Sequence, residues 1–196
     1  MSENEVQEVL EPKGSKKEKE KKTLKQEIIS WVVTLATAIV LALVIRTFIF
    51  EPIRVDGSSM ADTLHDGEIT FTFKTGYLFN DPQRQDVVIC RYPNRSEYFV
   101  KRVMGIPGDT IAILGNTVYI NGQAVEEPYL TPERNRYDHT MKAVTLGENE
   151  YFVMGDNRDN SNDSRNLTSV GPITRDMIVG HVTCVLFPFN AIRGVE

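Results

Sequence analysis

The stretch TIAILGNTVYINGQAV, residues 110–125, decides the fold class of this chain. Three short apolar runs are separated by the dipeptides Gly115-Asn116 and Asn121-Gly122. Both dipeptides suit two-residue hairpin turns, which require the positive φ that glycine and asparagine tolerate. The stretch therefore predicts two successive β-hairpins.

Further runs rich in β-branched and aromatic residues lie on both sides of these hairpins. They are EITFTFK (68–74), DVVICRY (86–92), EYFVKRVMG (97–105), EYFVMG (150–155) and MIVGHVTCVLF (177–187). No long amphipathic helix and no internal repeat is evident among them. We expect residues 51–196 to form one mainly antiparallel β domain. A chain of 196 residues is long enough for one such domain and an additional segment.

The extra part is an apolar segment near the N-terminus. IISWVVTLATAIVLALVI, residues 28–45, contains no charged side chain. At about 1.5 Å per residue, a helix of this length covers roughly 27 Å, close to the hydrocarbon thickness of a bilayer. A buried core helix would show polar positions at helical spacing, and a cleaved secretory signal would end in small residues. We predict a retained transmembrane anchor over residues 28–50.

The charges on either side of the span predict its orientation. A lysine-rich stretch precedes it, whereas the far flank carries Arg46, Glu51 and Arg54. By the positive-inside rule, the N-terminus is then cytoplasmic and residues 51–196 are extracytoplasmic. Residues 1–27 hold few apolar side chains to bury, which predicts a disordered cytoplasmic tail.

The overall charge and the cysteines exclude some functions and leave one question open. The formal net charge is −5, and from Pro52 onward acidic residues outnumber basic ones, which argues against nucleic-acid binding. Cys90 and Cys184 fall in predicted strands, where they either pair or remain buried free thiols. No Cys/His spacing suggests a metal site, and no cofactor is expected.

A candidate nucleophile lies in VDGSSMADTL (55–64), where Ser58 and Ser59 stand side by side in a small-residue turn. A Ser/His/Asp arrangement is the usual way to activate such a serine. The histidines of the chain are His65, His139 and His181. They fall in a turn, a polar run and a strand, and no GxSxG elbow is present, so we expect surface or packing roles for them.

Lys101 offers a better base. On an alternating strand it shares a face with Phe99 and Val103. Desolvation by such neighbours lowers a lysine pKa from about 10.4 and makes a neutral amine available, which can take the proton of a serine hydroxyl in a Ser/Lys dyad. The alternative is an edge-strand lysine that discourages aggregation.

A third segment, GDNRDNSNDSR at 155–165, contains no apolar side chain. A calcium loop of the EF-hand type is excluded, because counting from Asp159 places Ser164 where glycine is needed and Val170 where glutamate is needed. The segment suits an internally hydrogen-bonded scaffold that supplies a hydroxyl and charge pairs to a neighbouring site. A generic polar turn is the alternative.

Together, GSSM followed by TL, KRVMGIPGD (101–109) and GDNRDNSNDSR, behind an N-terminal anchor, resemble the type I (leader) signal peptidase family over essentially the whole chain. The single span resembles the Gram-positive bacterial form. The resemblance implies a membrane-bound serine endopeptidase without a cofactor. Its partners would be the lipid bilayer and secreted preproteins, whose N-terminal signal peptides it removes by cutting after small residues at Ala-x-Ala type sites.

The resemblance also implies roles for individual residues. Ser59 corresponds to the nucleophile and Lys101 to the general base. The supporting residues are Ser161, which would orient the lysine, Asp163 and Arg165, which would form an ion pair, and Gly155 in the same motif. Candidate walls of the substrate pockets are Val55, Met60, Leu64, Phe99 and Val100. An exposed apolar rim near the bilayer would include Ile53, Phe71 and Phe73.

Two positions depart from the family pattern. Gly57 stands where some members carry a hydroxyl that binds the oxyanion, so the second oxyanion donor is open. Asp62 stands where proline is usual; facing Lys101 it would hold the amine protonated, so we expect it to point away. The alternatives are a catalytically weak or inactive membrane-anchored homologue that acts as a binding module, and a self-cleaving Ser/Lys autopeptidase.

Overall fold

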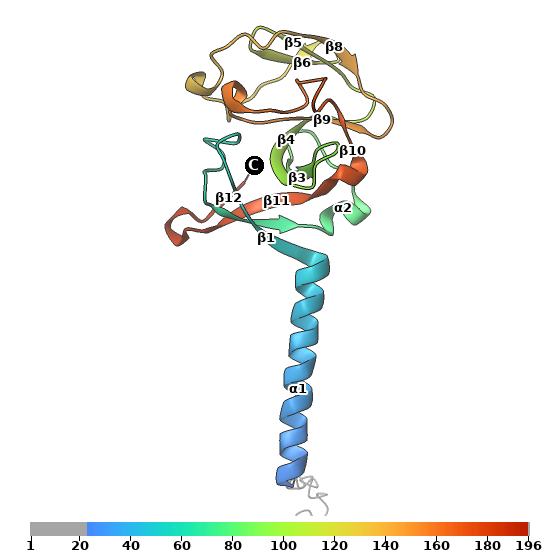
Figure 1. Ribbon diagram of the computed structural model, residues 1–196, viewed down its shortest axis with the longest axis vertical. Coiled ribbons are helices and arrows are strands. Elements are labelled where there is room, and N and C mark those ends of the chain that lie inside the picture. The colour runs from blue at the N-terminus through green and yellow to red at the C-terminus, as the bar shows by residue number, and fades with distance from the viewer. Residues whose placement is uncertain (1–22, 196) are drawn as a thin grey trace, which may run out of the picture. The chain divides into compact units, whose positions relative to one another are not determined.

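The computed structural model describes residues 23–195 (Figure 1). The chain divides into an N-terminal unit that ends at Ala42 and a C-terminal unit that begins at Leu43. The tail predicted over residues 1–27 lies outside the described residues, apart from its last positions, 23–27.

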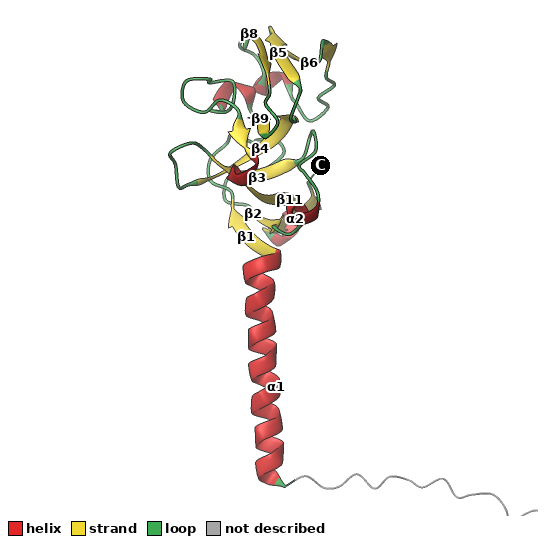
Figure 2. Ribbon diagram, turned by 90° about the vertical axis from the view of Figure 1, so that its right-hand side faces the viewer, coloured by secondary structure: helices red, strands yellow, loops and turns green. Residues whose placement is uncertain are grey.

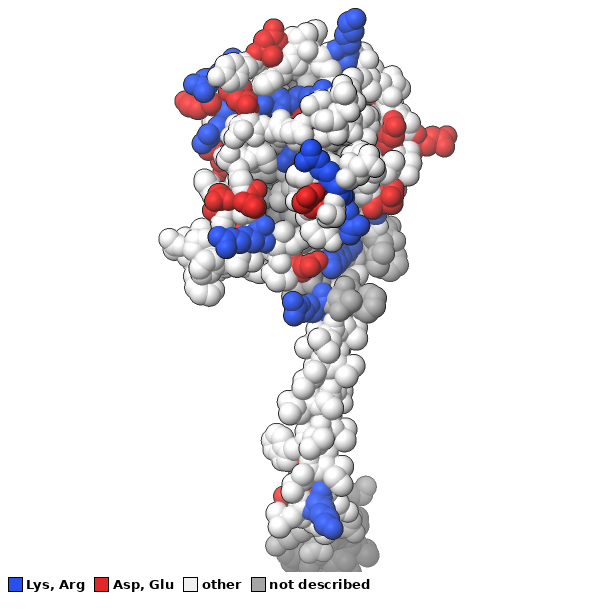
Figure 3. All heavy atoms as spheres, in the orientation of Figure 1, with Lys and Arg blue, Asp and Glu red and all other residues white. Residues whose placement is uncertain are grey.

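The N-terminal unit contains all but the last two residues of one long helix, α1 (Leu24–Val44). It is long and apolar enough to cross a membrane, and none of its residues is buried. Charged side chains are confined to its start (Figure 3). The helix begins before the predicted span because Thr23 and Gln26 form reciprocal capping hydrogen bonds, from Thr23 N to Gln26 Oε1 (2.9 Å) and from Gln26 N to Thr23 Oγ1 (3.4 Å).

The C-terminal unit is built on a large sheet with the strand order β1-β2-β11-β3-β4-β9-β10 and with β12 paired to β11. Every pair in it is antiparallel. The strands are β1 (Phe50–Arg54), β2 (Ile69–Phe73), β3 (Val87–Arg91), β4 (Tyr98–Gly105), β9 (Glu150–Met154), β10 (Ile173–Thr174), β11 (Ile178–Phe187) and β12 (Arg193–Gly194). The five predicted runs outside the hairpins are all strands, which confirms the mainly antiparallel β fold.

A smaller sheet has the order β7-β6-β5-β8. Its strands are β5 (Thr110–Leu114), β6 (Thr117–Ile120), β7 (Gln123–Ala124) and β8 (Met141–Thr145). Both predicted hairpins are present, with φ of 60° at Gly115, 52° at Asn121 and 80° at Gly122. In both ribbon views this sheet lies beside β9 and β4, at the end of the unit away from β1 (Figures 1 and 2).

Several elements were not predicted. Phe50, assigned to the anchor, opens β1, and a π-helical turn, Ile45–Ile49, precedes it. Strand β8 is largely exposed, so it lacks a clear apolar pattern, and β7, β10 and β12 are very short. The short helical elements are α2 (Gly76–Phe79) and the 3₁₀ turns Pro132–Arg134, Arg158–Asn160, Arg175–Met177 and Phe189–Ala191.

The apolar core places β3 and β4 in the interior of the C-terminal unit. On β3, Val88 and Cys90 belong to one buried cluster, whereas Val87 and Ile89 belong to another on the opposite face. Strand β4 pairs with β3 and β9 on its two sides. From Lys101 to the end of β4, side chains on both faces of the strand are therefore removed from water, whatever their polarity.

Candidate active site

Ser59 lies in the turn that connects β1 to β2. The turn begins with Gly57, whose φ is 90° and whose N–H donates to Asp66 Oδ1 at 2.8 Å. Met60 and Leu64 follow the serine and are almost fully buried, with exposed fractions of 1% and 0%. The Leu64 N–H donates to Met60 O at 2.7 Å, so Ser59 is held on a turn whose next residues are anchored in the core.

Lys101 reaches Ser59 from strand β4. Its Nζ lies 2.7 Å from Ser59 Oγ and 2.8 Å from Val100 O. Only 2% of the lysine is exposed. Burial lowers the pKa of Lys101, and the charges of Asp163 and Asp156 do not offset that effect. A neutral amine beside a serine hydroxyl is the arrangement that general-base activation requires.

Three hydrogen bonds from the polar loop 155–165 hold the serine turn. The Asn157 N–H donates to Ser59 O at 3.0 Å, and Asn157 Nδ2 donates to Ser58 O at 3.0 Å. Asn160 Nδ2 donates to Ser58 Oγ at 2.8 Å. These hydrogen bonds leave the Ser59 side chain to Lys101, so the two adjacent serines have different environments.

Gly155 stands where the loop passes closest to the nucleophile. A Cβ at this position would lie 2.5 Å from Ser59 O and closer still to Ser161 Oγ. Side chains larger than hydrogen therefore do not fit. Ser161 Oγ is buried, and its interaction with the Asp163 carboxylate helps to lower the pKa of that group.

Asp163 and Arg165, which both belong to the polar loop, form an ion pair. Arg165 Nε lies 2.8 Å from Asp163 Oδ1, and Arg165 Nη2 lies 2.9 Å from Asp163 Oδ2. Burial raises the pKa of Asp163, but the hydrogen bonds and charge of Arg165 outweigh it and lower the pKa overall. Asp163 also accepts the Gly155 N–H at 3.0 Å, so the carboxylate fixes the loop at its closest point to Ser59.

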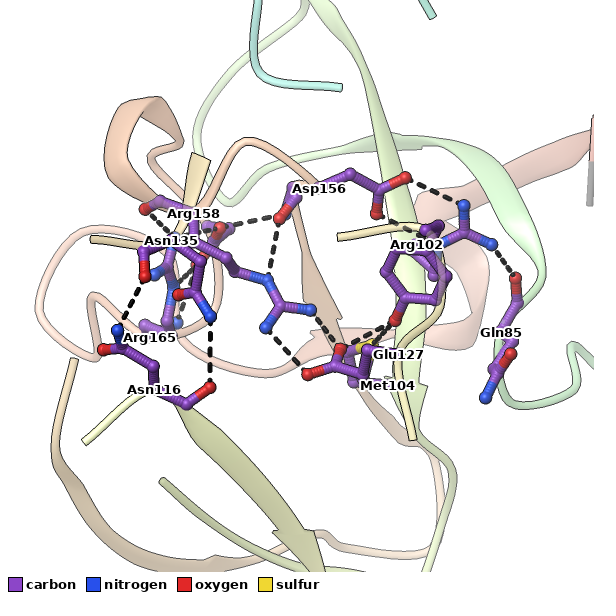
Figure 4. Close-up of polar contacts among 12 residues, drawn as sticks. Gln85, Arg102, Met104, Asn116, Glu127, Asn135, Asp156, Arg158 and Arg165 are labelled. Atoms are coloured by element: carbon purple, nitrogen blue, oxygen red, sulfur yellow. Dashed lines mark hydrogen bonds and ion pairs between the residues drawn. The ribbon is translucent and has the colours of Figure 1, made fainter. Parts of the chain in front are cut away.

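A second ion pair, which the sequence did not indicate, lies directly behind Lys101. Arg102 points to the opposite face of β4, where its Nε and Nη2 donate to Asp156 at 3.0 and 2.8 Å (Figure 4). Both side chains are only 1% exposed. Asp156 also accepts the Thr63 hydroxyl at 2.5 Å, which ties the serine turn to β4 from behind. The KR pair itself was the available signal, because two adjacent strand residues face opposite ways.

A cleft of about 440 Å³ opens over Ser59 and Lys101. Of the predicted walls, Val55, Met60, Phe99 and Val100 line it. Leu64 does not, because it is fully buried in the core cluster beneath the serine turn. The remaining lining residues are Ile53, Arg54, Asp56, Arg95, Glu97 and Tyr98.

Asp62 is turned to another part of the molecule. Its carboxylate accepts the Thr131 hydroxyl at 2.7 Å and lies 3.7 Å from Arg134 Nε. The φ of Asp62 is 59°, a left-handed value that aspartate tolerates and that proline, fixed near −65°, cannot adopt. A proline could therefore not replace Asp62 without a change of the backbone conformation.

The histidines lie beside carboxylates elsewhere: His65 beside Glu68, His139 beside Asp159 and His181 beside Asp86. Cys90 and Cys184 are free thiols, which resolves the open question of their pairing. Within residues 23–195, no group of His, Cys, Asp and Glu side chains is arranged to hold a metal ion.

The predicted apolar rim differs from the observed one. Ile53, Phe71 and Phe73 are half-buried; Ile53 packs against the core and the Phe73 ring lies against Gly76. Large apolar side chains are exposed instead around the turn between β11 and β12. They are Leu186, Phe187, Phe189 and Ile192.

The chain is similar in sequence to known signal peptidases. Residues 28–187 match the model of a family described as signal peptidase, peptidase S26. The chain is 42% identical to signal peptidase I of Bacillus licheniformis, over 88% of this chain and 95% of the relative. It is 41% identical to signal peptidase I T of Bacillus subtilis strain 168, over 96% of this chain and 100% of the relative. A solved signal peptidase I from Enterococcus faecalis V583 is 32% identical, with a TM-score of 0.47 over 53% of this chain and 98% of that one.

The similarity of this chain to the peptidase S26 family and to signal peptidase I proteins shows that it is a serine peptidase. The chain belongs to the signal peptidase family, peptidase S26, and its matched relatives carry the type I name.

Proposed function

We propose that this protein is a membrane-anchored signal peptidase that hydrolyses peptide bonds through a Ser59–Lys101 dyad. The observation that carries the proposal is the 2.7 Å distance between Ser59 Oγ and the buried Lys101 Nζ. Burial lowers the pKa of the Lys101 amine, which favours the neutral form that a general base needs, and no other base lies within hydrogen-bond distance of Ser59 Oγ in the part of the chain described.

Acylation begins when Lys101 takes the Ser59 proton and Oγ attacks the scissile carbonyl carbon. The protonated amine then donates to the leaving nitrogen as the C–N bond breaks, which leaves an ester at Ser59. Lys101, neutral again, takes a proton from water, and the resulting hydroxide attacks the ester carbonyl. The C–Oγ bond then breaks and Ser59 recovers its proton.

The oxyanion site rests on the backbone of the serine turn. The Ser59 N–H makes no hydrogen bond within residues 23–195 and is available to the developing oxyanion. The Gly57 N–H already donates to Asp66 and is not free for this purpose. We assign Ser59 N–H as one donor and leave its partner unassigned.

The supporting residues stiffen this site. Asp163, paired with Arg165, fixes the Gly155 backbone, and Gly155 allows the polar loop to approach Ser59. Ser161 lies against Gly155 and interacts with the Asp163 carboxylate, and we assign it the role of orienting the Lys101 amine that the family resemblance implies.

Substrate selection follows from the cleft. Its apolar walls, Val55, Met60, Phe99 and Val100, suit small side chains one and three residues before the cut, as in Ala-x-Ala sites. The substrates would be preproteins that carry signal peptides. We infer that α1 anchors the enzyme in the bilayer with the lysine-rich N-terminus in the cytoplasm and the β domain outside.

The inactive binding module is the less favoured alternative. Its only sequence hint was Asp62, and that carboxylate contacts Thr131 and Arg134. The dyad contact itself is intact.

Cleavage of a preprotein tests the proposal. The full chain in detergent should remove the signal peptide from a substrate with an Ala-x-Ala site. Ser59→Ala and Lys101→Ala should each reduce the rate by about 10³-fold or more, since each removes one half of an interdependent pair. The exposed Lys142→Ala serves as the matched control for Lys101→Ala and should still cleave. Absence of cleavage by the parent would support the binding module, and full activity of either dyad variant would refute the dyad.

A further inference from the structure

A buried carboxylate outside the three sequence motifs contacts the polar loop. Glu127 follows β7 and pairs with Arg158, and their side chains are 6% and 2% exposed. Arg158 Nη1 donates to Glu127 Oε2 at 3.0 Å, and Nη2 donates to Glu127 Oε1 (Figure 4). Because neither charge at this depth has water as an alternative partner, the two side chains must keep this bidentate geometry.

On one side, this pair fixes the loop that holds the serine. Arg158 Nε donates to Gly155 O at 3.1 Å, and Arg165 Nη2 donates to Arg158 O at 2.9 Å. The same loop donates the Asn157 N–H to Ser59 O. A shift of the Arg158 guanidinium would therefore move the backbone that supports Ser59.

On the other side, Glu127 is connected to the lysine strand through Tyr129. The Tyr129 hydroxyl donates to Glu127 Oε1 at 2.7 Å, and the centre of its ring lies 3.8 Å from Arg102 Cζ. Arg102, the residue after Lys101, is bound to Asp156. Glu127 thus contacts two groups, one behind each member of the dyad.

We propose that Glu127 is a positioning residue, which holds the Ser59 turn and the Lys101 strand at reacting distance through Arg158 and Tyr129. The inference rests on the proposed dyad function. Removing the Glu127 charge leaves Arg158 buried without its ion-pair partner, and the loop must move to hydrate it. Because a displacement of about 1 Å costs on the order of 10²-fold in rate, the effect should fall on the chemical step.

The test compares Glu127→Gln with Glu126→Gln in the full chain in detergent, with cleavage of the Ala-x-Ala preprotein as the assay. Glu126 is the adjacent carboxylate and is exposed, so the control changes the same charge by the same chemistry. Tyr129→Phe is the second variant, because it keeps the ring over Arg102 and removes only the hydroxyl, which reaches Glu127 Oε1 at 2.7 Å and Met104 Sδ at 3.4 Å. Urea unfolding of each variant measures the fraction of folded enzyme, and the cleavage rates are divided by it.

We expect kcat per folded enzyme to fall about 10- to 100-fold in Glu127→Gln, with KM within about threefold of the parent. Tyr129→Phe should show a smaller loss in the same direction, and Glu126→Gln should stay within about twofold. Since the Tyr129 hydroxyl and Glu127 share a hydrogen bond, the double variant should lose less than the two single losses combined.

The inference is overturned if folded Glu127→Gln turns over within twofold of the parent, or if its loss equals the loss of folded protein. If Glu127→Gln does not fold, an unchanged kcat in Tyr129→Phe overturns it. If the parent cleaves and either of these outcomes is found, the inference fails while the proposed function stands. If the parent does not cleave, the proposed function itself fails.

Discussion

Lys101 and Arg102 are neighbours on β4, face opposite sides of the strand and are both almost fully buried. The arginine is matched by Asp156 through two hydrogen bonds, whereas the lysine has a serine hydroxyl and a carbonyl oxygen as its partners. A buried charge without a counter-charge is relieved by losing its proton, and a buried charge with one is retained. The comparison teaches that one strand supplies a reactive base on one face and a fixed support on the other.

Replacing Lys101 by Met should have the largest effect on activity. The shape of the side chain is nearly kept and the base is lost, so cleavage should fall by about 10³-fold or more. The free energy of unfolding should change by less than about 1 kcal/mol, since the lost hydrogen bonds are partly offset by the loss of a desolvated amine. Cleavage assays and urea unfolding at neutral pH measure the two quantities.

The same variant gives a pH-dependence with a defined sign. The pKa of Lys101 is lowered in the folded chain, so between that lowered pKa and about 10.4 the unfolded chain binds more protons. The stability of the parent relative to Lys101→Met should therefore rise with pH across this window. A flat or falling difference would show that the lysine is not desolvated.

Replacing Arg102 by Met should instead damage stability most. Asp156 would remain buried without its partner, and the free energy of unfolding should fall by about 3–5 kcal/mol. Combining Arg102→Met with Asp156→Leu should recover much of this loss, because both charges are then absent. If Arg102→Met were as stable as the parent, the contrast between the two faces of β4 would be wrong.

Gly155→Ala should reduce turnover with a smaller change in stability. The new methyl group would meet Ser59 O and Ser161 Oγ, so the polar loop must retreat from the nucleophile. A kcat loss of about 10- to 100-fold is expected. Gly194→Ala is the matched control, since a Cβ there meets no atom within 4 Å.

Substitutions of Asp62 should have the smallest effects on stability, and two of them should differ in a defined order. Asp62→Asn should change stability by less than about 0.5 kcal/mol, because asparagine tolerates the left-handed backbone and its amide oxygen can still accept the Thr131 hydroxyl. Asp62→Pro should be worse, although proline is the residue usual in the family, because its ring excludes a φ of 59°. Thermal unfolding of the two variants tests the order, and a better-folded proline variant would contradict it.

The fold and the dyad were predictable because their signals are local. The hairpins follow from Gly115-Asn116 and Asn121-Gly122, and the burial of Lys101 follows from its apolar neighbours on an alternating strand. The KR pair indicated that Arg102 faces away from Lys101, but the ion-pair partners were not predictable, because Arg102 and Asp156 are 54 positions apart and Glu127 and Arg158 are 31 apart. Nothing in the local sequence distinguishes the buried Glu127 from the exposed Glu126 beside it.

The pH dependence of kcat/KM for preprotein cleavage tests the central claim most directly, since it reports the ionisation of the free enzyme's base. We predict an acid limb whose apparent pKa lies well below about 10.4, and which is absent from the residual activity of Lys101→Met. Activity that rises only as the pH approaches 10.4, or an acid limb that persists in Lys101→Met, would contradict the account.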